Sequence, residues 1–132
     1  VIGFSIMSVI GGRLDKESRA YVDQLVPVIT QSWDSGELIS RASPEFLKVA
    51  SQEKLESFLK ICAGKLGNFK KYNGAKGEAT IQVTPAGKVV VANYIAQVDF
   101  ERAPADVKIT LIKRDKEWKV LGFHINSDAF FE

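Results

Sequence analysis

The sequence predicts an α+β domain in which N-terminal helices pack on a curved antiparallel sheet of about four strands. Its apolar residues repeat with a helical period as far as residue 66 and with a period near two after residue 67. Turn residues then divide the second half of the chain at the spacing of successive hairpins. The 132 residues are enough for one hydrophobic core and too few for two ordinary domains.

A long amphipathic helix is predicted over residues 14–33, because apolar residues recur there at spacings of three, four and seven. Gly36 ends this helix, since glycine adopts the left-handed conformation that terminates helices. Residues 37–42 are expected to form another helical turn or two.

Two serines begin the helices that follow. Ser43, followed by Pro44, is the expected N-cap of a short helix through residue 50. Ser51 is the expected N-cap of a second helix, which ends near Gly67. The apolar face of that helix consists of Leu55, Phe58, Leu59, Cys62 and Leu66.

Strands follow in the second half. The predicted strands cover residues 69–72, 77–84, 88–101, 107–113 and 118–126. The first is short and lies within a linking stretch, residues 68–75. Residues 84–87 supply a turn, and residues 114–117 join the last two strands in a hairpin.

Both faces of the strand at residues 88–101 contain apolar side chains. One row is Val90, Ala92, Tyr94, Ala96, Val98 and Phe100, and the opposite row contains Val89, Val91 and Ile95 before it becomes polar toward its end. One face accommodates the helices, and the other favours a two-fold homo-oligomer. The alternative is that sheet curvature buries part of both rows within a monomer.

The first twelve residues differ from the rest of the chain. They comprise seven large apolar residues, three Gly and two Ser, so all 34 charged residues follow them. We therefore divide the chain into an apolar segment, residues 1–13, and one α+β domain, residues 14–132. Twelve residues are fewer than the about 20 that a spanning helix needs.

This apolar segment resembles the end of an uncleaved signal-anchor or the tail of a signal peptide. The alternatives are a core element of the domain and a segment that packs against neighbouring subunits. The side chains expected to contact a membrane or another subunit are Ile2, Phe4, Ile6, Met7, Val9 and Ile10. We expect an exported protein, located in the periplasm or anchored facing it.

Four stretches support a family resemblance over residues 14–128: Trp33-Asp34-Ser35-Gly36, Ser51-Gln52-Glu53-Lys54-Leu55, Leu66-Gly67-Asn68-Phe69, and the terminal Trp118 to Ile125. In this order they resemble the cystatin-like, nuclear-transport-factor-2-like superfamily, and in particular its small exported bacterial domains of unknown function. The resemblance implies a pocket between the helices and the concave sheet. It also brings enzymes such as ketosteroid isomerase into consideration.

An isomerase-like reaction needs a carboxylate base and an acidic donor that converge on an apolar cavity. The candidate residues for such roles are Tyr94, Asp99 and His124, and Tyr72 and Tyr21 are weaker candidates. None matches the isomerase catalytic set position by position. A buried Tyr94 would more ordinarily pack its ring and satisfy its hydroxyl locally.

The chain contains few other residues that could act as catalytic groups or metal ligands. His124 is the sole histidine, and strand alternation places it on the face of Trp118 and Val120. Cys62, the sole cysteine, lies on an apolar helix face and is expected to be a core residue. The chain lacks metal-binding His or Cys spacings and glycine-rich phosphate loops, so the sequence predicts no metal and no cofactor.

Four lysines, Lys65, Lys70, Lys71 and Lys76, form a basic stretch without acidic residues. Such a loop, with Phe69 and Tyr72 within it, suits phosphate or anionic lipid head groups. The alternative is a solvated connection that protects a strand edge. A net charge of +2 argues against nucleic acid as the partner.

These observations favour a non-catalytic binding or assembly domain, exported or membrane-tethered, acting through protein contacts or a small apolar ligand. Its expected partners are further copies of the chain or a membrane-associated protein. One alternative is an isomerase-like or hydrolase-like enzyme that uses the cavity. Another is a structural subunit of a filament or membrane complex, packed through its apolar N-terminus.

Overall fold

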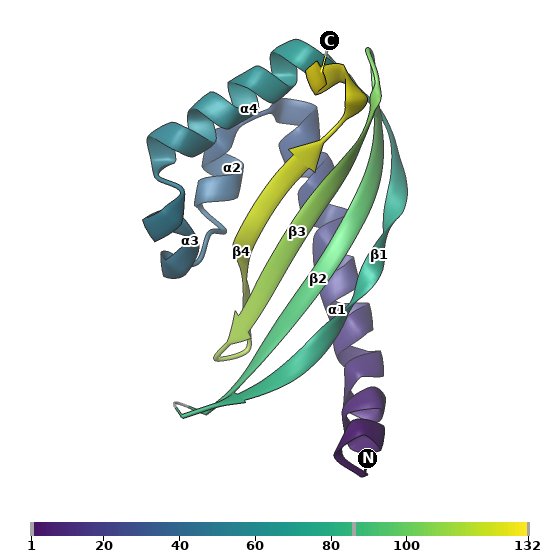
Figure 1. Ribbon diagram of the computed structural model, residues 1–132, viewed down its shortest axis with the longest axis vertical. Coiled ribbons are helices and arrows are strands. Elements are labelled where there is room, and N and C mark those ends of the chain that lie inside the picture. The colour runs from purple at the N-terminus through teal and green to yellow at the C-terminus, as the bar shows by residue number, and fades with distance from the viewer. Residues whose placement is uncertain (1, 86, 132) are drawn as a thin grey trace.

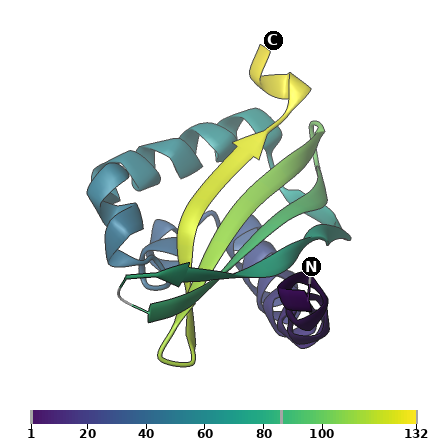
Figure 2. The same ribbon diagram turned by 60° about the horizontal axis from the view of Figure 1, so that its bottom comes forward.

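The computed structural model describes residues 2–85 and 87–131, without the side chains of residues 2–11 and 84. Helices cover one face of a four-stranded antiparallel sheet in the order β1-β2-β3-β4 (Figure 1). The predicted α+β class and the strand number are therefore confirmed. Seen from below, α1 lies along the β1 side of the sheet, and the shorter helices lie toward β4 (Figure 2).

The helices are α1 (Ile2–Ser32), α2 (Ser35–Ile39), α3 (Pro44–Val49) and α4 (Gln52–Leu66). Both predicted serine caps are confirmed. The Ser43 hydroxyl accepts from Phe46 N at 3.2 Å, and the Ser51 hydroxyl accepts from Lys54 N at 3.3 Å. Helix α1 begins at Ile2, well before the predicted start at residue 14, so the backbone of the apolar segment is continuous with the first helix of the domain.

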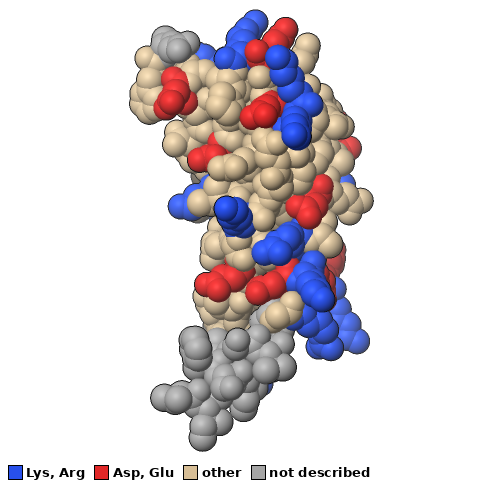
Figure 3. All heavy atoms as spheres, turned by 90° about the vertical axis from the view of Figure 1, so that its right-hand side faces the viewer, with Lys and Arg blue, Asp and Glu red and all other residues tan. Residues whose placement is uncertain are grey.

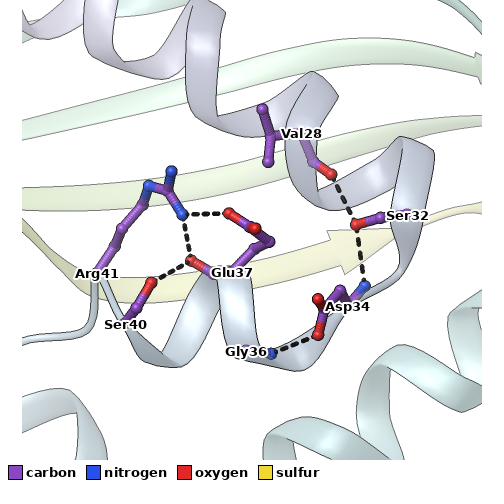
Figure 4. Close-up of polar contacts among 7 residues, drawn as sticks. All are labelled: Val28, Ser32, Asp34, Gly36, Glu37, Ser40 and Arg41. Atoms are coloured by element: carbon purple, nitrogen blue, oxygen red, sulfur yellow. Dashed lines mark hydrogen bonds and ion pairs between the residues drawn. The ribbon is translucent and has the colours of Figure 1, made fainter.

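A network of short hydrogen bonds forms the corner between α1 and α2 (Figure 4). Trp33, with φ of 53°, ends α1 in the left-handed conformation. The Ser32 hydroxyl donates to Val28 O at 2.9 Å and accepts from Asp34 N at 3.1 Å. Asp34 Oδ1 accepts from Gly36 N at 2.9 Å and so caps α2. The stretch from Trp33 to Gly36 is therefore a helix-to-helix turn.

Two stretches that support the family resemblance meet at this corner. The Trp33 indole donates to Gly67 O at 3.2 Å and stacks on Phe100 with ring centroids 5.3 Å apart. Phe69 packs edge-on against the same Phe100 ring at 6.4 Å. Their role is thus to join the helices to the sheet.

The strands are β1 (Phe69–Thr84), β2 (Gly87–Phe100), β3 (Pro104–Arg114) and β4 (Glu117–Asn126), followed by a 3-10 helix at Asp128–Phe131. The predicted link at residues 68–75 is wrong, because β1 is one strand of 16 residues. Its register against β2 shifts between Phe69 and Lys71 and between Tyr72 and Ala75. The extra residues are accommodated as bulges, so the polar stretch does not interrupt the strand.

The core lies between the sheet and the helices. The predicted inner row of β2 is confirmed, since Ala92, Tyr94, Ala96, Val98 and Phe100 are all buried. Facing residues of α1 that are buried with them are Val22, Leu25, Val26 and Ile29. Leu59, Ile109 and Leu111 are fully buried as well, so large side chains fill the space between the layers.

Both edges of the sheet are partly covered. Along β4, Ser43 N donates to Val120 O at 2.8 Å, and Val120 N donates to Arg41 O at 2.7 Å. Along β1, Ala79 N donates to the Asp15 carboxylate at 2.6 Å. Edge strands with occupied backbone groups are poor templates for another strand.

Candidate functional site

The first described turns of α1 are fixed to the sheet by a polar cluster, which we call the helix lock: Asp15, Glu17, Ser18, Tyr94 and Trp118. Asp15 belongs to it through the edge contact with Ala79. The Ser18 and Tyr94 hydroxyls lie 2.7 Å apart, and Ser18 Oγ lies 2.7 Å from Leu14 O. The two hydroxyls therefore share a hydrogen bond, and Leu14 O is a further acceptor for Ser18.

Glu17 forms the other half of the helix lock. Its carboxylate accepts from the Trp118 indole at 2.7 Å and pairs with Lys113. The hydrogen bond from Lys113 lowers the pKa of Glu17 below its ordinary range. Lys113 Nζ also lies 5.5 Å from the centre of the Trp118 ring. One helix turn thus contacts β1 and β2 through Asp15 and Ser18, and β3 and β4 through Glu17.

Tyr94 is a buried part of this lock, with 1% of its surface exposed. Its hydroxyl lies 2.9 Å from Asp15 O as well as close to Ser18. Burial raises the pKa of Tyr94, so the hydroxyl is protonated at neutral pH. Asp99 lies five residues along the same strand and therefore on the opposite row. The structure does not bring Tyr94 and Asp99 together as an acid and base pair.

His124 lies on the edge strand β4, where it is exposed and stacks on Phe58 with centroids 6.1 Å apart. The prediction that it shares a face with Trp118 and Val120 is wrong. The register shifts at Leu121, so Val120 pairs with Leu111 while His124 pairs with Lys108. The extra residue of the bulge exchanges the two faces of β4 at that point.

The two weaker tyrosine candidates, Tyr72 and Tyr21, have contacts of their own. Tyr72 donates to Asp23 at 2.5 Å, and burial together with that carboxylate raises the pKa of Tyr72. Tyr21 is half-buried against the core, and burial raises its pKa too. These contacts attach α1 to the sheet and leave both phenols protonated at neutral pH.

Cys62 is fully buried in α4, as the sequence predicts. Burial raises the pKa of its thiol to about 12, so almost no reactive thiolate exists at neutral pH. Among residues 2–85 and 87–131, no three His, Cys, Asp or Glu side chains lie where they could hold a metal ion together. Nor does that part of the chain contain a helix long and apolar enough to cross a membrane.

The four basic-stretch lysines are all exposed, but they do not lie on one loop. Lys65 is in α4, and the other three are in β1. Lys71 pairs with Asp99 across the strands, and Lys76 pairs with Ile95. On the α1 and β1 side of the molecule, basic and acidic side chains intermix (Figure 3).

The outer face of the sheet is the face away from α1. Ile95 is 47% exposed there, whereas Ile112 is 5% exposed and Val91 is half-buried, so curvature covers part of the apolar row. Two shallow depressions of about 400 and about 470 Å³ adjoin Ile95 and share Lys76. Lys108 borders the larger one.

Comparisons of the chain with protein-family models, with curated proteins and with solved structures found no match. The resemblance to the cystatin-like, nuclear-transport-factor-2-like superfamily therefore stays a prediction. The helix lock was not predicted from the sequence. The only signal for it is the alternation of acidic and basic residues directly after the apolar segment.

Proposed function

We propose that the protein is a non-catalytic binding and assembly domain, tethered by the apolar start of α1 to the outer side of a membrane. The observation that supports this most directly is the helix lock. Asp15, Glu17 and Ser18 fix α1 to all four strands immediately after the uncharged residues. Through a continuous helix, the lock sets the direction in which the apolar residues leave the domain.

The composition of that helix start fits a tether. A helix that is apolar on all sides is stable in lipid or against other protein, and residues 2–10 contain no charge. In Figure 1 the N-terminal end of α1 extends past the lower end of the sheet. Charges begin at Arg13, next to Leu14, which is the first buried core residue among the described side chains.

The outer sheet face is the surface that we propose for protein contacts. Both sheet edges are partly occupied, by Asp15 on one side and by the segment around Ser43 on the other. Ile95 and the adjoining depressions remain accessible in the centre of the outer face. We propose a further copy of the chain or a membrane-associated protein as the partner for this surface.

The tether is tested by flotation of the full chain with lipid vesicles. Replacing Ile6 and Val9 together by Lys should leave thermal unfolding unchanged and abolish flotation. Val49→Lys, at a position 74% exposed on α3, is the matched control and should float normally. Flotation of the Ile6 and Val9 variant at the level of the unchanged protein would contradict the tether.

A further inference from the structure

Three segments far apart in the sequence lie at one end of the molecule. Figure 1 shows the start of α1, the turn between β1 and β2 and the turn between β3 and β4 together at the lower end. Figure 2 shows that the three are spread around that end. The C-terminal 3-10 helix lies at the opposite end. The three segments therefore belong to the same end of the domain.

The tip of the first hairpin presents an uncovered apolar side chain. On β1 the residues that face the helices are Ala79, Ile81 and Val83, the pairing partners of Ala92, Val90 and Lys88. Ala79 is buried and Ile81 half-buried, but Val83 is 78% exposed. The row of β1 side chains that faces the core thus continues beyond the helices that cover the sheet. Pro85, in the turn that follows, is exposed as well.

Exposed basic side chains surround this end, and its acidic side chains are mostly engaged within the protein. The exposed basic residues at these three segments are Arg13, Lys16, Lys88 and Lys116. Nearby acidic residues with internal partners are Asp15, Glu17, Glu45 and Glu117. Asp115 is left as an opposing charge, so the charge offered to a surface is net positive.

We propose that this end of the domain rests on an anionic lipid bilayer, with Val83 entering the interface and the basic residues contacting head groups. The proposal rests on the tether proposed above and adds the orientation of the domain. A bilayer is the occupant that fits both features, because an apolar side chain flanked by basic groups is typical of interfacial contact. The strands then point toward the membrane, and the outer sheet face stays available for a partner.

The experiment measures the depth of single positions in the membrane-bound full chain. Val83→Cys is labelled with an environment-sensitive fluorophore, and Phe131→Cys, 84% exposed at the opposite end, is the matched control. Cys62 does not compete for the label, because it is fully buried. Vesicles of phosphatidylglycerol with phosphatidylethanolamine should shift the emission at position 83 to the blue and leave position 131 unchanged.

A charge variant tests the head-group contact separately. A basic residue near an anionic surface contributes about fivefold to binding, so Lys88→Glu should weaken partition into the same vesicles by at least about fivefold. Lys60→Glu, on the exposed side of α4, is the control and should have little effect.

The outcomes separate the two proposals. If the full chain floats but the label at position 83 behaves like the label at position 131, the orientation is wrong and the tether stands. An unchanged partition of the Lys88→Glu variant likewise overturns the head-group contact alone. If the unlabelled full chain does not float at all, the tether fails, and the orientation fails with it.

Discussion

Replacing Tyr94 by Phe tests whether this tyrosine holds the helix lock together. The substitution keeps the buried ring and removes only the hydroxyl, which lies 2.7 Å from Ser18 Oγ and 2.9 Å from Asp15 O. Ser18 still donates to Leu14 O, so its own hydrogen stays bonded. The change therefore removes the hydrogen-bonded contact between α1 and β2, keeps their apolar packing and creates no large void.

The expected loss of stability in the Tyr94→Phe variant follows from the hydrogen bonds that are lost. One buried hydrogen bond shared between two acceptors contributes about 1 to 2 kcal/mol once the poorer solvation of the remaining groups is included. An unfolding entropy of about 2.1 cal/mol/K per residue gives about 280 cal/mol/K for 132 residues. The Tm should consequently fall by about 4 to 7 °C.

The assay is thermal unfolding followed by circular dichroism at neutral pH. Tyr21→Phe is the matched control, because Tyr21 is half-buried and its hydroxyl has no hydrogen bond within the described residues. That variant should unfold within about 1 °C of the unchanged protein. A Tyr94→Phe variant no less stable than the Tyr21→Phe variant would refute the role of Tyr94 in the lock.

Three further predictions concern single sites. Gly77→Ala should destabilise the protein by about 1 to 3 kcal/mol in urea unfolding, because the added Cβ would lie 1.9 Å from Asn93 O; Gly122→Ala, with 3.7 Å of clearance, should cost less. Cys62 should not react with a thiol reagent until the protein unfolds, since burial raises its pKa to about 12; reaction of the folded protein at pH 8 would disprove this. The hydrogen bond and ion pair with Arg114 lower the pKa of Glu45 from 4.5 to about 2. The pair's contribution to the free energy of unfolding is therefore complete above pH 4.5 and is lost as the pH falls toward 2. Glu45→Gln should therefore flatten that part of the acid unfolding curve, with an effect below about 1 kcal/mol at neutral pH because the pair is exposed.

The parts of the fold that the sequence predicts correctly are those decided by neighbouring residues. Ser43 and Ser51 cap helices because each hydroxyl reaches a backbone N–H three residues later. The buried row that contains Tyr94 follows from the two-residue period of a strand, and β2 keeps an unbroken register against β3. Neither feature depends on what lies far away in the chain.

The two errors in the strands share one physical origin, the β-bulge. A bulge adds a residue to one strand without changing the composition of the stretch, so a count of alternating positions passes over it. In β1, two register shifts lie within residues 68–75, which the sequence pattern predicts to be a link. In β4, the shift at Leu121 places His124 on the face opposite to the predicted one. The contact from Asp15 to Ala79 is not predictable from local sequence for a different reason, since its acceptor meets a backbone donor 64 residues away.

The helix lock also changes the meaning of the charges that follow the apolar segment. The stretch from Arg13 to Arg19 contains three basic and two acidic residues, so its formal charges nearly cancel. Both acidic residues have partners in the sheet: Asp15 accepts from Ala79, and Glu17 accepts from Trp118 and Lys113. The basic residues at this junction are exposed, so the surface beside the apolar start is more positive than its composition indicates. A nearly balanced sequence can thus place exposed basic side chains next to the proposed tether, because both carboxylates are already hydrogen-bonded within the domain.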